Sequence, residues 1–80
     1  MKLIRLPQTL DLQGISKSVL YTNIQQGLMT PPVKIGNSSA WPEQEVLAIN
    51  AALIAGKSKD EIKELVKKLI ANRQNAEVAA

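Results

Sequence analysis

The stretch "GISKSVLYTNIQQG", residues 14–27, predicts a short helix with a defined start and a defined end. Ser16 is a favourable N-cap, because a serine oxygen accepts a hydrogen bond from a free N–H group of the first turn. Gly27 suits the position just after the last turn, where the backbone is often left-handed. The stretch raises one question: whether this helix only packs in the core, or whether its outer side also binds another molecule.

The two sides of this helix differ in chemistry. Val19, Leu20 and Ile24 are predicted to face the core, with Ile15 leading into the helix. A polar stripe with a single cation is predicted on the other side, and it consists of Lys17, Ser18, Tyr21, Thr22 and Gln25. Most stripes of this kind are simply the solvated face of an amphipathic helix, so the context of the helix has to decide its role.

A first short helix precedes this one. "LPQTLDLQG" begins with Pro7, which suits a first helical turn, and ends at Gly14, which suits a stop. Only Gly14 and Ile15 separate this helix from the Ser16 cap. Two short helices joined by a tight turn are the layout of a helix-turn-helix, in which the second helix enters the DNA major groove.

A small β-hairpin is predicted after the second helix. Pro31 and Pro32 exclude a helix, and the short run Val33 to Ile35 is followed by a turn at Gly36-Asn37 and by polar residues that lead to Trp41. We expect Trp41 to be a core anchor that holds the hairpin on the helices, rather than a side chain that stacks on DNA.

Two more helices follow the hairpin. The third runs from Pro42 to Gly56, and the fourth begins at Ser58, which forms a capping-box pattern with Glu61. The fourth helix carries an apolar stripe at helical spacing, which consists of Ile62, Leu65, Val66, Leu69 and Ile70. This stripe either packs back on the same domain or forms a dimer seam, and the sequence leaves both alternatives open.

Composition excludes several classes of function. The 80 residues include no Cys and no His, so thiolate and imidazole metal sites and the usual catalytic base are absent. No nucleophile–base pair or phosphate-binding glycine loop is recognisable, and we predict no enzyme, no cofactor and no small-molecule ligand. No apolar run approaches the length of a membrane span, which predicts a cytoplasmic protein without a membrane partner.

The charge is unevenly distributed along the chain. Residues 1–41 carry four basic side chains and one acidic one, whereas residues 42–80 carry six of each. The whole excess of +3 therefore lies in the part that contains the predicted helix-turn-helix. A modest basic excess is compatible with nucleic acid but does not require it.

The ordered set of motifs resembles the AlpA family of prophage transcriptional regulators. The resemblance covers roughly residues 3–70 and rests on "RLP", "GISKSVLY", "GLMTPPVKIG" and "WPEQEV" in this order, followed by "INAALIAGKSKDEIKELVKKL". Members of that family are small winged helix-turn-helix proteins related to excisionase and MerR-type DNA-binding domains. The resemblance implies a mostly α fold with a small β-hairpin as the wing and a C-terminal amphipathic helix.

This resemblance divides the chain into three parts. Residues 1–56 would form the winged helix-turn-helix domain, residues 57–73 the C-terminal helix that packs on it or mediates dimerisation, and residues 74–80 a flexible tail. The residues implied in DNA binding are Arg5, Lys17, Ser18, Tyr21, Thr22, Gln25, Lys34, Asn37 and Ser38, with Ser39 completing the wing tip.

The expected function is sequence-specific binding of double-stranded DNA at the nucleoid, as a prophage regulator or an excision factor that directs an integrase. The family pattern has basic residues near Thr22 and Gln25, where this chain is neutral. We therefore expect weak binding by one molecule, helped by a homodimer or by neighbouring molecules on DNA. The alternative is a protein-interaction module that binds an integrase or a regulator through its C-terminal helix.

Overall fold

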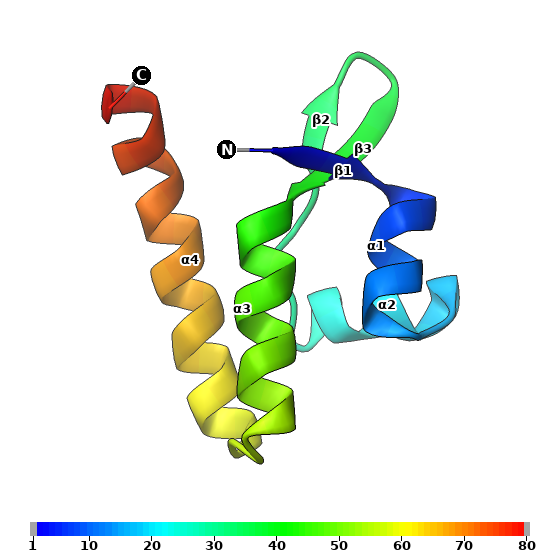
Figure 1. The fold of residues 1–80 in the computed structure, drawn as a ribbon, viewed down its shortest axis with the longest axis vertical. Helices are drawn as coiled ribbons and strands as arrows, with labels where there is room; N and C mark the ends of the chain where they lie inside the picture. Colours follow the sequence, from blue (N-terminus) through cyan, green and yellow to red (C-terminus); the bar gives the residue numbers. More distant parts are fainter. Residues whose placement is uncertain (1, 80) are drawn as a thin grey trace.

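The computed structural model describes the backbone of residues 2–79 and the side chains of residues 2–74. Over these residues the chain forms four helices and a three-stranded antiparallel sheet (Figure 1). In chain order the elements are β1 (Leu3–Arg5), α1 (Leu6–Gln13), α2 (Lys17–Gln25), β2 (Val33–Ile35), β3 (Ser38–Pro42), α3 (Glu43–Ile54) and α4 (Lys59–Ala79). The expected mostly helical fold with a small hairpin is confirmed at this level.

The sheet joins the N-terminal residues to the hairpin. Its strand order is β1-β3-β2, so β3 is the central strand, with Ile4 opposite Trp41 on one side and Val33 opposite Ala40 on the other. The predicted hairpin and its turn at Gly36 are therefore confirmed. The sequence did not predict β1, which is only three residues long and pairs with a segment far along the chain.

Glycine and serine shape the turn between α1 and α2 as predicted. Gly14 adopts the left-handed conformation, with φ at 66°, and its N–H donates to the carbonyl oxygen of Leu10 at 2.8 Å. An L-residue with a Cβ rarely adopts this conformation, so glycine is the favoured residue here. Two residues later, the Ser16 Oγ accepts from the backbone N–H of Val19 at 3.3 Å and caps α2. The chain therefore leaves α1 and enters α2 within three residues.

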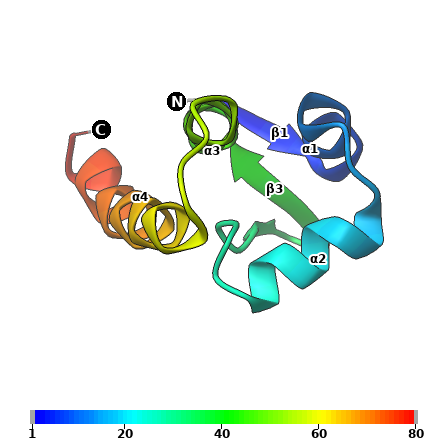
Figure 2. The ribbon, with the colours of Figure 1, turned by 90° about the horizontal axis from the view of Figure 1, so that it is seen from below.

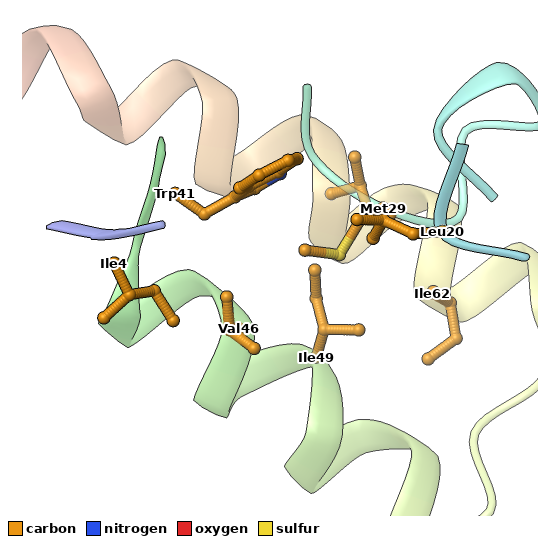
Figure 3. Close-up of a cluster of buried hydrophobic side chains, with 8 residues drawn as sticks. Ile4, Leu20, Met29, Trp41, Val46, Ile49 and Ile62 are labelled. Carbon is orange, nitrogen blue, oxygen red and sulfur yellow. The ribbon is translucent and has the colours of Figure 1, made fainter. Parts of the chain in front are cut away.

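One apolar cluster joins the four helices to strands β1 and β3. Figure 3 shows side chains from β1, α2, β3, α3 and α4 converging on it, among them Ile4, Leu20, Trp41 and Ile62. Trp41 is fully buried, and its indole N–H donates to the carbonyl oxygen of Thr30 at 2.9 Å. Trp41 is therefore the predicted core anchor, because a fully buried ring cannot stack on DNA.

The apolar stripe of α4 packs on its own domain. Ile62 and Val66 belong to the buried cluster, and Leu65 and Leu69 pack against it, whereas Ile70 remains 39% exposed. Of the two alternatives left by the sequence, this is intramolecular packing. In Figure 1, α4 lies on one side of α3, and α1 and α2 lie on the other side.

A buried ion pair fastens the second half of α4. The Arg73 guanidinium donates to both carboxylate oxygens of Glu45, at 2.8 and 2.7 Å, and also to the carbonyl oxygen of Pro31 at 2.7 Å. Glu45 is only 3% exposed. Glu45 therefore lies in the first turn of α3, where a carboxylate is favourable, but Arg73 buries it there instead of leaving it on the surface.

The far end of α4 also differs from the expectation. The sequence predicts an end at residue 73 and a flexible tail over 74–80, but α4 continues to Ala79. Residues 74–79 contain neither Gly nor Pro, so nothing in them stops a helix. No helix within the described residues combines the length and the apolar character that crossing a membrane requires.

Candidate nucleic-acid interface

Helix α2 is attached to the core by one side and leaves the other side in solvent. Leu20 is completely buried, and Ile15 and Ile24 pack against the cluster from either end of the helix. The side chains of the predicted polar stripe are exposed at Lys17, Ser18, Thr22 and Gln25. The fold uses none of these four side chains in a hydrogen bond or ion pair found among the described residues, so they are available to a ligand.

Val19 lies on the exposed side and not in the core. The sequence interpretation grouped it with Leu20 and Ile24, but Val19 is 45% exposed. The helical period explains the difference: Val19 is three residues from Thr22, which places these two on one face, and five residues from Ile24, which places them on different faces. A careful count of helical angles would have found this from the sequence. The exposed side of α2 is therefore polar, with the branched apolar Val19 beside Thr22 at one edge of the polar stripe.

Tyr21 occupies the border between the two sides. Its side chain is partly buried, whereas its neighbour in sequence Thr22 is exposed. This intermediate burial is that of a side chain at the edge of the packed side of the helix. The structure therefore keeps Tyr21 beside the exposed face of α2 without placing it at the centre.

The hairpin carries the second group of predicted residues. Lys34 on β2 is exposed, and its Nζ donates to the Ser39 Oγ of β3 at 2.8 Å. Asn37 is exposed in the turn, and Ser38 is partly buried. The hydrogen bond holds the Lys34 ammonium against the hairpin, which limits how far this charge reaches from the molecule.

Arg5 lies next to the hairpin turn although it is distant in sequence. Arg5 ends β1 and directly precedes α1, where its backbone N–H donates to the Gln8 Oε1 at 3.0 Å. An open hollow of about 320 Å³ is lined by Arg5, Leu6, Pro7, Asn37, Ser38 and Ser39. The structure thus brings four predicted residues together around one hollow between the start of α1 and the hairpin turn: Arg5, Asn37, Ser38 and Ser39.

The two groups of predicted residues lie at different places along the α1 segment. The hollow is at the N-terminal end of α1, and α2 follows its C-terminal end (Figure 1). Each group has exposed basic side chains: Lys17 on α2, and Arg5 and Lys34 near the hairpin. In the same region Asp11 is the one acidic residue among residues 2–41. Charge around this surface is therefore sparse but mostly positive.

The chain is similar in sequence to a phage protein. Over 59 residues the chain is 36% identical to the uncharacterized protein ORF88 of Enterobacteria phage P4, and the match covers 72% of this chain and 67% of the phage protein. No protein-family model and no solved structure matches the chain.

Proposed function

The chain belongs to the same protein family as ORF88 of Enterobacteria phage P4, and we propose that it is a prophage-type winged helix-turn-helix protein that reads double-stranded DNA. In this proposal it acts at the nucleoid as a transcription regulator or as an excision factor of the AlpA type. The observation that carries the proposal is the exposed face of α2, whose side chains the fold leaves unused.

The chemistry of this face suits base edges in the major groove. Lysine contacts guanine or phosphate oxygens, glutamine pairs with adenine, and serine and threonine bond to either bases or phosphates. Lys17, Thr22 and Gln25 offer these groups from exposed positions on a short helix. Val19 adds an apolar surface, which in the major groove is the partner of the thymine methyl group.

The hairpin fits the role of a wing that follows the DNA backbone. Arg5 and the amide and hydroxyl groups of Asn37 and Ser38 surround one hollow, where they would contact phosphate oxygens. The start of α1 at this hollow adds the partial positive charge of a helix N-terminus. Contacts of this kind fix the register of a protein on DNA but do not read its sequence.

The intramolecular packing of α4 argues against the alternative function. A protein-interaction module that uses the apolar stripe of α4 would need that stripe free, but Ile62 and Val66 are buried in the core of this chain. The main surface on which that alternative depends is therefore occupied.

The direct test is selection of bound duplexes from a random DNA pool at about 0.15 M salt, near physiological ionic strength. We expect enrichment of a short motif, with repeated copies if several molecules bind together. Recovery of no motif by the folded chain, with no retention of duplex DNA even at about 50 mM salt, where electrostatic binding is strongest, would refute the proposal.

A further inference from the structure

The start of α4 lies against the end of α2, the helix that is proposed to enter the DNA groove. The Lys63 Cγ is 3.9 Å from the position that a Cβ would take on Gly27, the residue that follows the C-cap of α2. A hollow of about 200 Å³ is lined by both helices at this point, with Asn23 from α2 and Lys59 and Ile62 from α4. Figure 2 shows the start of α4 next to the segment that follows α2.

The helical period separates the charges of α4 by side. Lys59 and Lys63 are four residues apart, so they lie on one side of the helix, the side that meets α2. Glu61 is two residues from each of them and therefore projects elsewhere. Asp60 and Glu64 lie on the outer side of the helix, since each is two residues from a buried position. The two lysines thus form a basic edge beside the end of α2, which we call the Lys59–Lys63 edge.

The ion pairs of α4 do not involve this edge. Glu61 pairs with Lys57 at 3.7 Å, and Glu64 pairs with Lys67 at 3.5 Å. Among the residues whose side chains the structure describes, neither lysine of the Lys59–Lys63 edge takes part in an ion pair. Residues 57–68 carry five basic and three acidic side chains, so a positive excess remains after these two pairs.

The end of α2 has no cation of its own. Lys17 stands at its start, whereas Gln25, Gln26 and Gly27 at its end are neutral. A helix in the major groove is bordered by the phosphates of both strands, with the groove about 12 Å wide. Nine residues of α-helix are about 14 Å long, so the two ends of α2 can approach both backbones. The Lys59–Lys63 edge supplies positive charge at the end where α2 has none.

We propose that Lys59 and Lys63 bind phosphates of the same DNA duplex that α2 reads, at the end of α2 opposite to Lys17. The aliphatic stem of Lys63 packs over Gly27, while the side chain as a whole remains exposed, so its ammonium group is free to extend to a phosphate. This inference rests on the proposed function. It gives a DNA-binding role to the half of the chain in which basic and acidic residues balance.

The first test measures the affinity of Lys59→Gln, Lys63→Gln and the control Lys68→Gln for the selected duplex at several salt concentrations. Each change removes one positive charge from α4, but Lys68 is five residues from Lys63 and lies on another side of the helix. A phosphate contact contributes about 0.9 to the slope of log affinity against log salt. Between about 50 and about 200 mM salt, Lys63→Gln should therefore lose about threefold less affinity than the unchanged chain. Lys68→Gln should behave like the unchanged chain, and circular dichroism verifies that all variants are folded.

Failure of this inference is distinguishable from failure of the proposed function. If the unchanged chain binds DNA and the slope is the same in Lys59→Gln and Lys63→Gln, α4 does not contact the phosphates and this inference alone is refuted. An equal loss of slope in Lys68→Gln would also overturn it, because the effect would then be one of net charge. If the unchanged chain retains no duplex at about 50 mM salt, both proposals are refuted.

The second test locates the contact with single cysteines, since the chain has none of its own. Lys17→Cys, Lys63→Cys and Lys68→Cys are each labelled with an iron–EDTA reagent that cuts nearby DNA backbone. Lys17 and Lys63 lie at opposite ends of α2, so these two variants should cut at opposite edges of the selected motif. Lys68→Cys should cut more weakly. Cutting by Lys63→Cys that is no stronger than cutting by Lys68→Cys would contradict the contact.

Discussion

Helices α2 and α4 are both amphipathic, yet they are attached to the same core in different ways. Helix α2 is short, contributes the fully buried Leu20 and leaves its polar face unused by the fold. Helix α4 is more than twice as long and buries Ile62 and Val66. The guanidinium of its Arg73 donates hydrogen bonds to Glu45 and to the carbonyl oxygen of Pro31.

This difference distinguishes a helix whose outer face is left open to solvent, α2, from a helix whose side chains stabilise the fold, α4. The outer side chains of α2 contribute little to the stability of the chain, so they are free to be chosen for a ligand. In α4 a polar side chain is part of the structure itself, because Arg73 neutralises a carboxylate that has no access to water. The amphipathic pattern alone does not distinguish the two cases.

Removal of the ion pair between Arg73 and Glu45 should have the largest effect on stability. Arg73→Ala leaves the buried Glu45 carboxylate without its partner, and we expect a loss of about 4 kcal/mol in the free energy of unfolding. Urea unfolding followed by circular dichroism measures this. Lys67→Ala is the control, since its pair with Glu64 is exposed and worth less than about 1 kcal/mol. If the two variants lost the same free energy of unfolding, the ion pair between Arg73 and Glu45 would not stabilise α4.

The neighbouring residues Leu20 and Val19 test how α2 is attached. Leu20→Ala creates a cavity in the core and should cost about 3 kcal/mol of stability. Val19→Ala shortens a side chain that is exposed to solvent, and it should change stability by no more than about 0.5 kcal/mol. The same unfolding assay compares them, and a large loss in Val19→Ala would mean that the exposed face of α2 is also needed for the fold.

If the outer face of α2 binds DNA, a change at Lys17 should have a smaller effect, and that effect should be on DNA affinity and not on stability. Lys17→Ala should weaken binding to all duplexes and lower the slope of log affinity against log salt by about 1. Titrations at several salt concentrations measure the slope, with Lys67→Ala again as the control. An unchanged slope would place Lys17 away from the phosphates.

A still smaller effect is expected for a single methyl group. If Val19 contacts a thymine, replacing that thymine by uracil in the selected duplex should cost about 0.8 kcal/mol of binding, the value of one buried methyl group. In Val19→Ala this difference between the two duplexes should largely disappear. A full difference in the variant would assign the methyl contact to another residue.

The smallest effect concerns pH and the start of α4. The Ser58 backbone N–H and hydroxyl lower the pKa of the Glu61 carboxyl by hydrogen bonding, and Lys57 adds to this. A lowered pKa in the folded state gives stability that is present above the ordinary carboxyl pKa and is lost as the pH falls through the lowered value. Glu61→Gln should therefore show a slightly weaker loss of stability in acid than the unchanged chain, and identical pH profiles would contradict this role.

Local signals in the sequence predicted much of the fold. Gly14 and Ser16 mark the turn between α1 and α2, and Gly36 marks the hairpin. The spacing from Ile62 to Leu69 marks the buried side of α4. Each of these features depends on residues within a few positions of each other. For this reason they are readable without knowledge of the partner elements.

The features that sequence reasoning missed depend on distant residues. Strand β1 has only three residues and exists because β3 offers an edge to it. Glu45 is buried because Arg73 reaches it from α4, which no local pattern announces. Val19 is the exception: its exposure follows from helical geometry, and the sequence interpretation gave too much weight to its apolar chemistry.

The same dependence applies to the predicted binding residues. Lys17, Ser18, Thr22 and Gln25 were assigned to the outer face of α2 from its period, and they lie there. The approach of Arg5 to Asn37 could not be derived in this way, since the β1–β3 pairing brings these segments together.

That pairing also has a consequence for how the chain folds. Ile4 pairs with Trp41 only when the chain between them, which contains α1, α2 and β2, closes into a loop. Closing so long a loop costs entropy before any contact repays it, and contacts of high sequence separation slow folding. A nine-residue helix such as α2 is marginal by itself in water. The chain should therefore fold as one cooperative unit, and α2 should lose its helical structure whenever the ends of that loop separate.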